Sequence, residues 1–215
     1  MNRFAVIPAL NESNSLANVV YSLSTYVDKI VVVDDGSFDN TSDVAKKAGA
    51  IVLRNEFNLG YEVSITQGLL YACSQNASSV ITFDADGQHP YDKVELMFGY
   101  IESGAYDVVI ACREYLPRLS ERIFSAYTNI KYDISDVLSG MKCYSRHALI
   151  NSGVKSAWNS VGSYITLHSI TTGLSVKTVS IRTYSRKDSS RFGLSIKSES
   201  IVLMAFLNAI FRIHA

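Results

Sequence analysis

The first half of the chain alternates short apolar runs with segments of helical periodicity, and this pattern limits its possible folds more than any other feature. Five apolar runs are expected to be strands: residues 4–8, 29–33, 50–53, 79–83 and 107–111. Helices are expected between them, over residues 16–23, from a cap at Asp39 or Asn40 to Lys47, and over residues 61–74 and 90–101. Strands that alternate with helices form βαβ units, and near-continuous Val/Ile strands are typical of burial on both faces. We therefore predict a Rossmann-like α/β fold with a mostly parallel sheet flanked by helices.

The pattern changes after Arg113. Helices are expected over residues 120–132 and 162–172, a loop or short strand over 136–142, a strand over 175–184, and an amphipathic helix over the tail 194–211. The chain has 215 residues and no linker rich in proline, glycine or serine. A single domain is therefore predicted.

Composition excludes several classes of protein. The net charge is zero, so no overall field favours nucleic acid. The three cysteines are odd in number and far apart, which favours small buried side chains in a reducing compartment.

Met1 to Phe4 lead directly into a strand, so no signal peptide is expected. The apolar run 201–211 is about half of the roughly 20 residues that cross a bilayer. A cytoplasmic protein is predicted, in which that tail forms a docking helix; the alternative is that the tail lies in the membrane interface as a peripheral contact.

Polar motifs follow three of the expected strands. They are Pro8–Glu12, Val33–Ser37 and Asp84-Ala85-Asp86. Taken singly, each has a structural explanation, such as a helix cap at Asn11 or a turn at Asp35-Gly36. Ligands of open α/β sheets bind outside the carboxyl ends of the strands. The coincidence of three motifs at one sheet edge therefore favours a binding site.

Asp84 and Asp86 suit a divalent cation held against phosphate oxygens, because hard cations take oxygen ligands and Mg²⁺ sites often combine carboxylates with substrate phosphates. Gln88 supplies a further, neutral oxygen. A cation on Asp86 would neutralise a leaving nucleoside diphosphate. Asp35 can accept hydrogen bonds from a nucleobase or ribose. The chain has neither G-x-G-x-x-G after the first strand nor G-x-x-x-x-G-K-[ST], which disfavours dinucleotide redox chemistry and a P-loop kinase.

Taken together, the motifs resemble those of the GT-A glycosyltransferases of family 2, and most closely the dolichyl-phosphate mannose synthase and polyprenyl-phosphate glycosyltransferase branch. The resemblance extends over nearly the whole chain. The motifs that carry it are Pro8–Glu12, Val33–Thr41, Asn58-x-Gly60 with Gly68, Asp84–Pro90, Val108–Arg113, Arg122-x-x-Ser125 and Asp136-x-x-Ser139-Gly140-Met141.

The resemblance implies one GT-A domain, in which residues 1–113 bind the nucleotide sugar and residues 114–215 form the acceptor side. It implies an inverting, Mg²⁺- or Mn²⁺-dependent transfer of a sugar from a nucleotide-diphosphate sugar to a polyprenyl phosphate or a lipid-linked glycan, at the cytoplasmic membrane face. The metal ligands it implies are Asp84, Asp86 and Gln88, and the catalytic residues are Asp86, Asp136 and Arg113. The implied substrate-binding residues are Pro8, Ala9, Asn11, Glu12, Asp35, Gly36, Asp84, Ala85, Gln88, Arg122 and Arg191.

Several alternatives stay open. Asp136 is a candidate base if the acceptor is a hydroxyl, but a phosphate anion needs no base. The basic run 182–197 is either a solvated face or a loop that closes over diphosphate through residues such as Arg191, which stands where the family motif has lysine. One rival is a non-catalytic partner with a vestigial donor site. Another is a sugar-1-phosphate nucleotidyltransferase, which should carry a basic, glycine-rich loop where this chain has Pro8–Glu12.

Overall fold

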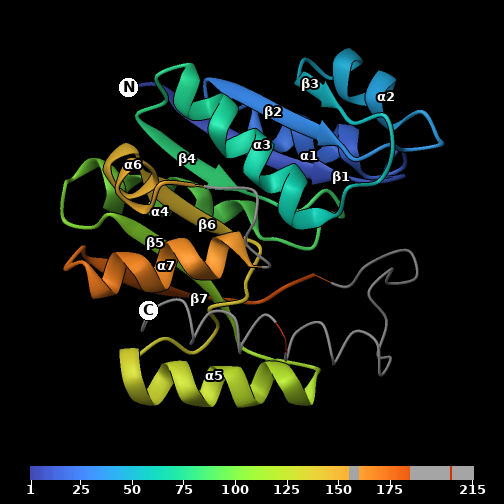
Figure 1. Cartoon of the computed structure of the whole chain (residues 1–215). Helices are drawn as coiled ribbons and strands as arrows, with labels where there is room; N and C mark the ends of the chain where they lie inside the picture. The colour runs from blue at the N-terminus through green and yellow to red at the C-terminus, as the bar shows by residue number, and fades with distance from the viewer. Residues whose placement is uncertain (155–159, 185–203, 205–215) are drawn as a thin grey trace.

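A seven-stranded sheet organises the part of the chain described by the computed structural model, which comprises residues 1–154, 160–184 and Met204. The strands are β1 (Arg3–Ala9), β2 (Lys29–Asp34), β3 (Ile51–Arg54), β4 (Ser79–Thr82), β5 (Val108–Arg113), β6 (Lys142–Ser145) and β7 (Val176–Ile181). Their order across the sheet is β3-β2-β1-β4-β6-β5-β7 (Figure 1). All pairings are parallel except those of β6, which runs antiparallel to both of its neighbours. The predicted mostly parallel α/β fold is confirmed.

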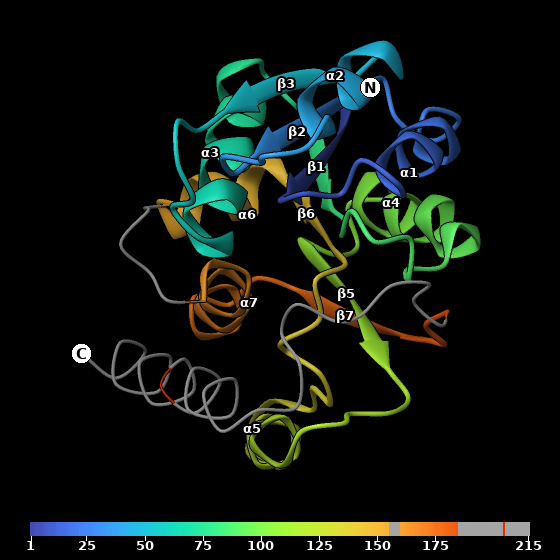
Figure 2. The ribbon, with the colours of Figure 1, turned by 90° about the vertical axis from the view of Figure 1, so that its right-hand side faces the viewer.

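Helices cover both faces of the sheet. They are α1 (Leu16–Leu23), α2 (Thr41–Lys47), α3 (Tyr61–Ser74), α4 (Val94–Glu102), α5 (Leu119–Tyr132), α6 (Arg146–Ser152) and α7 (Val161–Thr171), with a 3₁₀ turn over Tyr91–Lys93. Helices α3, α6 and α7 lie on one face and α1, α2 and α4 on the other (Figure 2), and their buried side chains pack against the strands. In β1, Phe4 and Val6 enter the first layer while Ala5 and Ile7 enter the second. Burial on both faces explains why the strands are continuous apolar runs.

Helix α3 lies unusually close to the sheet, because Gly68 has no side chain. A Cβ at this position would lie 2.2 Å from Cγ1 of Val6 in β1. Glycine therefore allows direct contact between helix and strand. This contact sets the first turn of α3 beside the carboxyl end of β1.

Two elements were not predicted, namely β6 and α6. The residues expected as a loop or short strand over 136–142 end where β6 begins. Because β6 is antiparallel, the residues that precede it emerge at the same edge where β4 and β5 end. The expected helix over 90–101 is divided into the 3₁₀ turn and α4. The expected tail helix, apart from Met204, and the basic run beyond Tyr184 lie outside the described residues. No helix within the described ranges is long and apolar enough to cross a bilayer.

Candidate active site

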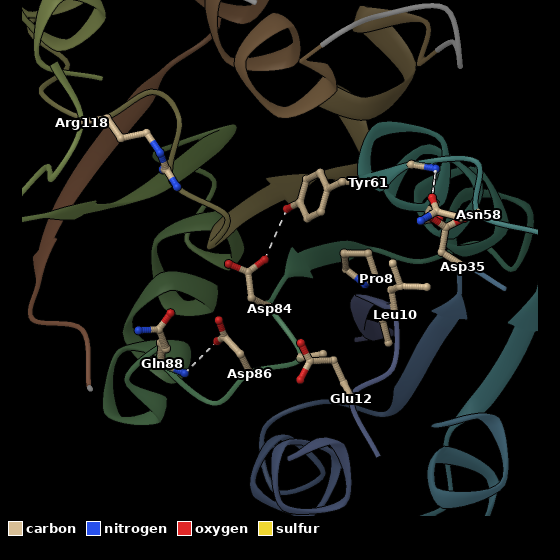
Figure 3. Close-up of a pocket in the computed structure, with 14 residues that line it drawn as sticks. Pro8, Leu10, Glu12, Asp35, Asn58, Tyr61, Asp84, Asp86, Gln88 and Arg118 are labelled. Atoms are coloured by element: carbon tan, nitrogen blue, oxygen red, sulfur yellow. Dashed lines mark hydrogen bonds between the residues drawn. The ribbon is translucent and has the colours of Figure 1, made fainter. Parts of the chain in front are cut away.

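A cavity of about 530 Å³ opens at the carboxyl ends of β1, β2 and β4 (Figure 3). Eight of the predicted site residues line it: Pro8, Ala9, Glu12, Asp35, Asp84, Ala85, Asp86 and Gln88. Six further lining residues were not among the predicted site residues: Leu10, Asn58, Gly60, Tyr61, Ser64 and Arg118. The cavity has the size of a typical small-molecule site, and it lies where ligands of open α/β sheets bind.

Asp84 and Asp86 occupy the turn after β4. Oδ2 of Asp84 lies 2.9 Å from Nε2 of the buried His89, and Oδ1 accepts a hydrogen bond from the Tyr61 hydroxyl at 3.4 Å. Burial opposes ionisation of Asp84, but nearby His89, Arg113 and Lys142 outweigh it and hold the pKa of this carboxyl below its ordinary value. Asp84 is therefore ionised at neutral pH.

The turn also fixes the groups that follow. Oδ1 of Asp86 accepts a hydrogen bond from the backbone N–H of Gln88 at 3.0 Å. The side-chain amide nitrogen of Gln88 donates to the carbonyl of Tyr184 at 3.1 Å, which orients its Oε1. Figure 3 shows the side chains of Asp84, Asp86 and Gln88 along one wall of the cavity.

These residues fit a hard divalent cation, because they offer oxygen ligands and at least one fixed negative charge. Among the described residues, no group of three or more histidine, cysteine or acidic side chains could hold a metal ion by itself. A cation at Asp84 and Asp86 would thus need ligands from elsewhere. Phosphate oxygens of a bound nucleotide are the usual source for Mg²⁺.

Asp35 organises the loop that leads into α3. Its Oδ1 accepts hydrogen bonds from Nδ2 of Asn55 and from the backbone N–H of Leu59, both at 2.9 Å, and its Oδ2 accepts one from Gly60 at 2.8 Å. Gly60 has a φ of 96°, a conformation that favours glycine. Three protein donors therefore fix this carboxylate at the cavity wall before any substrate binds.

Two predicted substrate-binding residues, Asn11 and Gly36, do not line the cavity. Asn11 joins two loops, since its backbone N–H donates to Oγ of Ser37 and its Oδ1 accepts from the N–H of Phe38, both at 2.8 Å. A Cβ on Gly36 would lie 2.6 Å from the carbonyl carbon of Phe57. Both residues support the walls of the site, and their direct contact with substrate stays a prediction.

Asp136 lies in the loop before β6 and is bonded to Arg113 at the end of β5. Its Oδ2 accepts hydrogen bonds from the backbone N–H and Nε of Arg113 at 3.0 and 2.7 Å, and its Oδ1 accepts one from Nη2 at 3.1 Å. Burial works against the charged guanidinium, but Asp136 and Glu121 outweigh burial and raise the pKa of Arg113 further above its ordinary value. The side chain of Asp136 is 1% exposed. A buried carboxylate that already accepts three hydrogen bonds is poorly placed to take a proton from a substrate, so the geometry argues against Asp136 as a base.

The two arginines near α5 lie differently from the prediction. Arg122 is exposed, donates to the carbonyl of Leu116 at 2.9 Å and lies over the ring of Tyr115, away from the cavity lining. The expectation that Arg122 faces the substrate stays a prediction, which this position does not support. Arg118, which the sequence did not indicate, lines the cavity and donates to Oε1 of Glu121 at 2.7 Å. Glu121 also accepts from the backbone N–H of Arg118 at the start of α5.

The predicted substrate-binding residue Arg191 lies outside the described residues.

This fold and this site define a GT-A glycosyltransferase. The chain belongs to glycosyl transferase family 2, whose family model matches residues 4–190. An uncharacterized protein of Methanocaldococcus jannaschii is 33% identical over 97% of this chain and 92% of its own length. The UDP-N-acetylglucosamine–dolichyl-phosphate N-acetylglucosaminyltransferase of Methanococcus voltae is 28% identical over 68% of this chain and 70% of its own.

Solved structures agree with the fold. Glucosyl-3-phosphoglycerate synthase from Mycobacterium tuberculosis, in complex with Mn²⁺, uridine diphosphate and glucosyl-3-phosphoglycerate, matches with a TM-score of 0.76 and 21% identity. The match covers 96% of this chain and 78% of that one. The same enzyme has also been crystallised with Mg²⁺ and uridine diphosphate. At this identity the match establishes the architecture alone.

Proposed function

We propose that this glycosyltransferase is metal-dependent and inverting, and that it transfers a sugar from a nucleoside-diphosphate sugar to a polyprenyl phosphate. The observation that carries the proposal is the pair Asp84 and Asp86 on a nucleotide-sized cavity, with the cation Arg118 on the same cavity. The dolichyl-phosphate acceptor named for the Methanococcus voltae relative supports the choice of acceptor. A lipid-linked glycan is the alternative acceptor.

Each wall of the cavity has a separate part in this proposal. Pro8, Leu10 and Asn58 line the side nearest Asp35, where the nucleoside would bind (Figure 3). Asp84, Asp86 and Gln88 would hold Mg²⁺ or Mn²⁺, which when bound neutralises the diphosphate of the leaving group. The guanidinium of Arg118 would bind the acceptor phosphate, since arginine offers a planar fork that matches phosphate oxygens.

An inverting transfer is a single displacement. An oxygen of the acceptor forms a bond to the anomeric carbon while the bond from that carbon to the diphosphate oxygen breaks, so the protein needs no nucleophile. A phosphate acceptor is already an anion and needs no base. The engagement of Asp136 by Arg113 supports a phosphate acceptor, because the carboxylate expected to deprotonate a hydroxyl is occupied.

Polyprenyl phosphates reside in membranes, so the same proposal places the protein at the cytoplasmic membrane face as a peripheral protein. The tail, whose alternative interpretation is contact with the membrane interface, lies outside the described residues apart from Met204.

The proposal is tested first by calorimetric titration of UDP, GDP, CDP and dTDP, with and without Mn²⁺, on the wild type, Asp86→Ala and Asp43→Ala. Asp43 is an exposed acid on α2 and serves as the matched control. We expect one diphosphate to bind only with Mn²⁺, and Asp86→Ala to weaken that binding by at least about tenfold. The corresponding sugar nucleotide is then offered with a polyprenyl phosphate and with the matching polyprenol.

Transfer to the phosphate alone is the expected result. Absence of Mn²⁺-dependent binding for all four nucleotides would refute the donor site. Equal transfer to the polyprenol would refute the phosphate acceptor while leaving the donor site intact.

A further inference from the structure

Lys142 is a buried cation that the proposed chemistry does not use. It is the first residue of β6 and is 3% exposed. Its ammonium group donates a hydrogen bond to the carbonyl of Ser139, and its backbone N–H donates to Oγ1 of Thr82 at 3.2 Å. Among the described residues it forms no ion pair with a carboxylate. The charge is therefore directed at the backbone of the 136–141 loop.

That loop rests directly on the donor-site carboxylate. A Cβ built on Gly140 would lie 2.5 Å from Oδ2 and 2.7 Å from Oδ1 of Asp84. The carbonyl of Gly140 accepts a hydrogen bond from Oγ1 of Thr82 at 2.7 Å, which ties the loop to the end of β4. Such close packing means that a shift of the loop would change the space available to Asp84.

The loop is held on both sides of this contact. Asp136 at its start is bonded to Arg113 through three hydrogen bonds, and Ser139 is bonded to Lys142. Gly140 follows Ser139 and contacts Asp84. The arginine therefore fixes the beginning of the loop and the lysine fixes the part that touches the donor site.

The surroundings of Lys142 combine apolar side chains with polar groups that are incompletely hydrogen-bonded. A cavity of about 40 Å³ beside the ammonium is also lined by Glu62, Tyr144 and Gly162. The Tyr144 hydroxyl is buried and has no hydrogen-bond partner among the described residues. A space of this size is large enough for one water molecule. A Cβ on Gly162 would lie 3.2 Å from Nζ of Lys142, so glycine at this position of α7 leaves room for the ammonium that a larger residue would narrow.

Holding this charge opposes stability. Burial lowers the pKa of Lys142 to about 8, although Asp136 and Glu62 act in the opposite direction. An apolar side chain of similar length would avoid that penalty, since replacing buried charges by apolar groups is often neutral or stabilising. A charged side chain that destabilises the fold and lies beside the candidate active site points to a role in function.

We infer that Lys142 is a positioning residue that holds the 136–141 loop against Asp84, so that the donor and acceptor sides of the cavity keep one geometry. The kinetic part of this inference rests on the proposed function, but the structural part does not. Without the ammonium, the Ser139 carbonyl loses its bond and the loop is free to move. His89 would still bond Asp84, so donor binding should survive better than turnover.

The test compares the wild type with Lys142→Met, Gly162→Ala and the control Lys47→Met, which removes an exposed lysine from α2. Lys142→Met removes the charge at similar length. Gly162→Ala leaves the lysine but crowds its ammonium, and alanine within a helix is not expected to unfold the protein. Hydrogen exchange of a peptide covering residues 133–141 is measured first, without any ligand.

We expect exchange in this peptide to be about tenfold faster in Lys142→Met, less accelerated in Gly162→Ala, and unchanged in Lys47→Met. With an active wild type, kcat of Lys142→Met should fall at least about tenfold while KM for the sugar nucleotide stays within about threefold. A role confined to stability would not produce that separation.

Unchanged exchange in both Lys142→Met and Gly162→Ala would overturn the inference, whether or not the protein turns over a donor. Full kcat in Lys142→Met would also overturn it. An inactive wild type whose loop is loosened in Lys142→Met would instead count against the proposed function and leave the positioning role supported.

Discussion

Replacing the buried Lys142 by methionine should stabilise the protein near neutral pH, and the gain should shrink as the pH rises. The folded state lowers the pKa of this lysine from 10.5 to about 8, chiefly through burial. A difference of one pKa unit corresponds to about 1.36 kcal/mol, so the folded state disfavours the charged lysine by about 3 kcal/mol relative to the unfolded chain. Below pH 8 both states carry the proton and the full penalty applies. Between pH 8 and 10.5 the unfolded chain still binds a proton that the folded state has lost, so the wild type gains stability.

The measurement is urea unfolding of the wild type, Lys142→Met and Lys47→Met at several values between pH 7 and pH 9.5. The advantage of Lys142→Met over the wild type should fall by about 2 kcal/mol across this range, because the wild type recovers that part of the penalty. Lys47→Met reports the same change for an exposed lysine and should show a flat difference. A flat difference for Lys142→Met, or one that grows with pH, would refute the view that Lys142 is a charged group in an unfavourable environment.

Two further substitutions test the loop and its anchor. Gly140→Ala should push Asp84 aside, because the new Cβ would lie within 2.7 Å of both carboxylate oxygens. Calorimetry should then find Mn²⁺-dependent nucleotide binding at least about tenfold weaker. The control Gly99→Ala, whose Cβ meets no atom within 4 Å, should bind the nucleotide as the wild type does. Asp136→Asn should lower the free energy of unfolding in urea by about 3 kcal/mol, because it breaks a buried ion pair with Arg113. It should also lower kcat while nucleotide affinity is retained. A variant with both the turnover and the stability of the wild type would contradict the anchoring role.

The sequence was sufficient for elements whose identity depends on their own residues. Strand β1 was expected over residues 4–8 and spans Arg3–Ala9, and α3 was expected and found over Tyr61–Ser74. Burial on both faces produces unbroken apolar runs, and amphipathic helices produce spacings of three and four. The carboxyl ends of parallel strands share an edge, so placing Asp35, Asp84 and Asp86 on one cavity needed no further information.

The elements that were missed depend on their neighbours. Strand β6 begins with a lysine and has only four residues, and it is buried only because β4 and β5 lie on both sides of it. Helix α6 is seven residues long, too short for a periodic pattern to stand out. Arg118 reaches the cavity through the path of the chain between β5 and α5, whereas Arg122, one turn later, points elsewhere. Local pattern carries no information about such a path.

The central place of β6 has a consequence for the emergence of the chain from the ribosome. Strands β4 and β5 are not paired with each other, and 28 residues (114–141) separate the end of β5 from the strand that joins them. Until then β4 and β5 each present an unpaired edge to the other, and joining them awaits a non-local pairing, which is slow. The strand that closes the gap also brings the 136–141 loop onto Asp84. Joining β4 to β5 and setting this loop against Asp84 are therefore one event, and a truncated chain that ends before β6 would lack both.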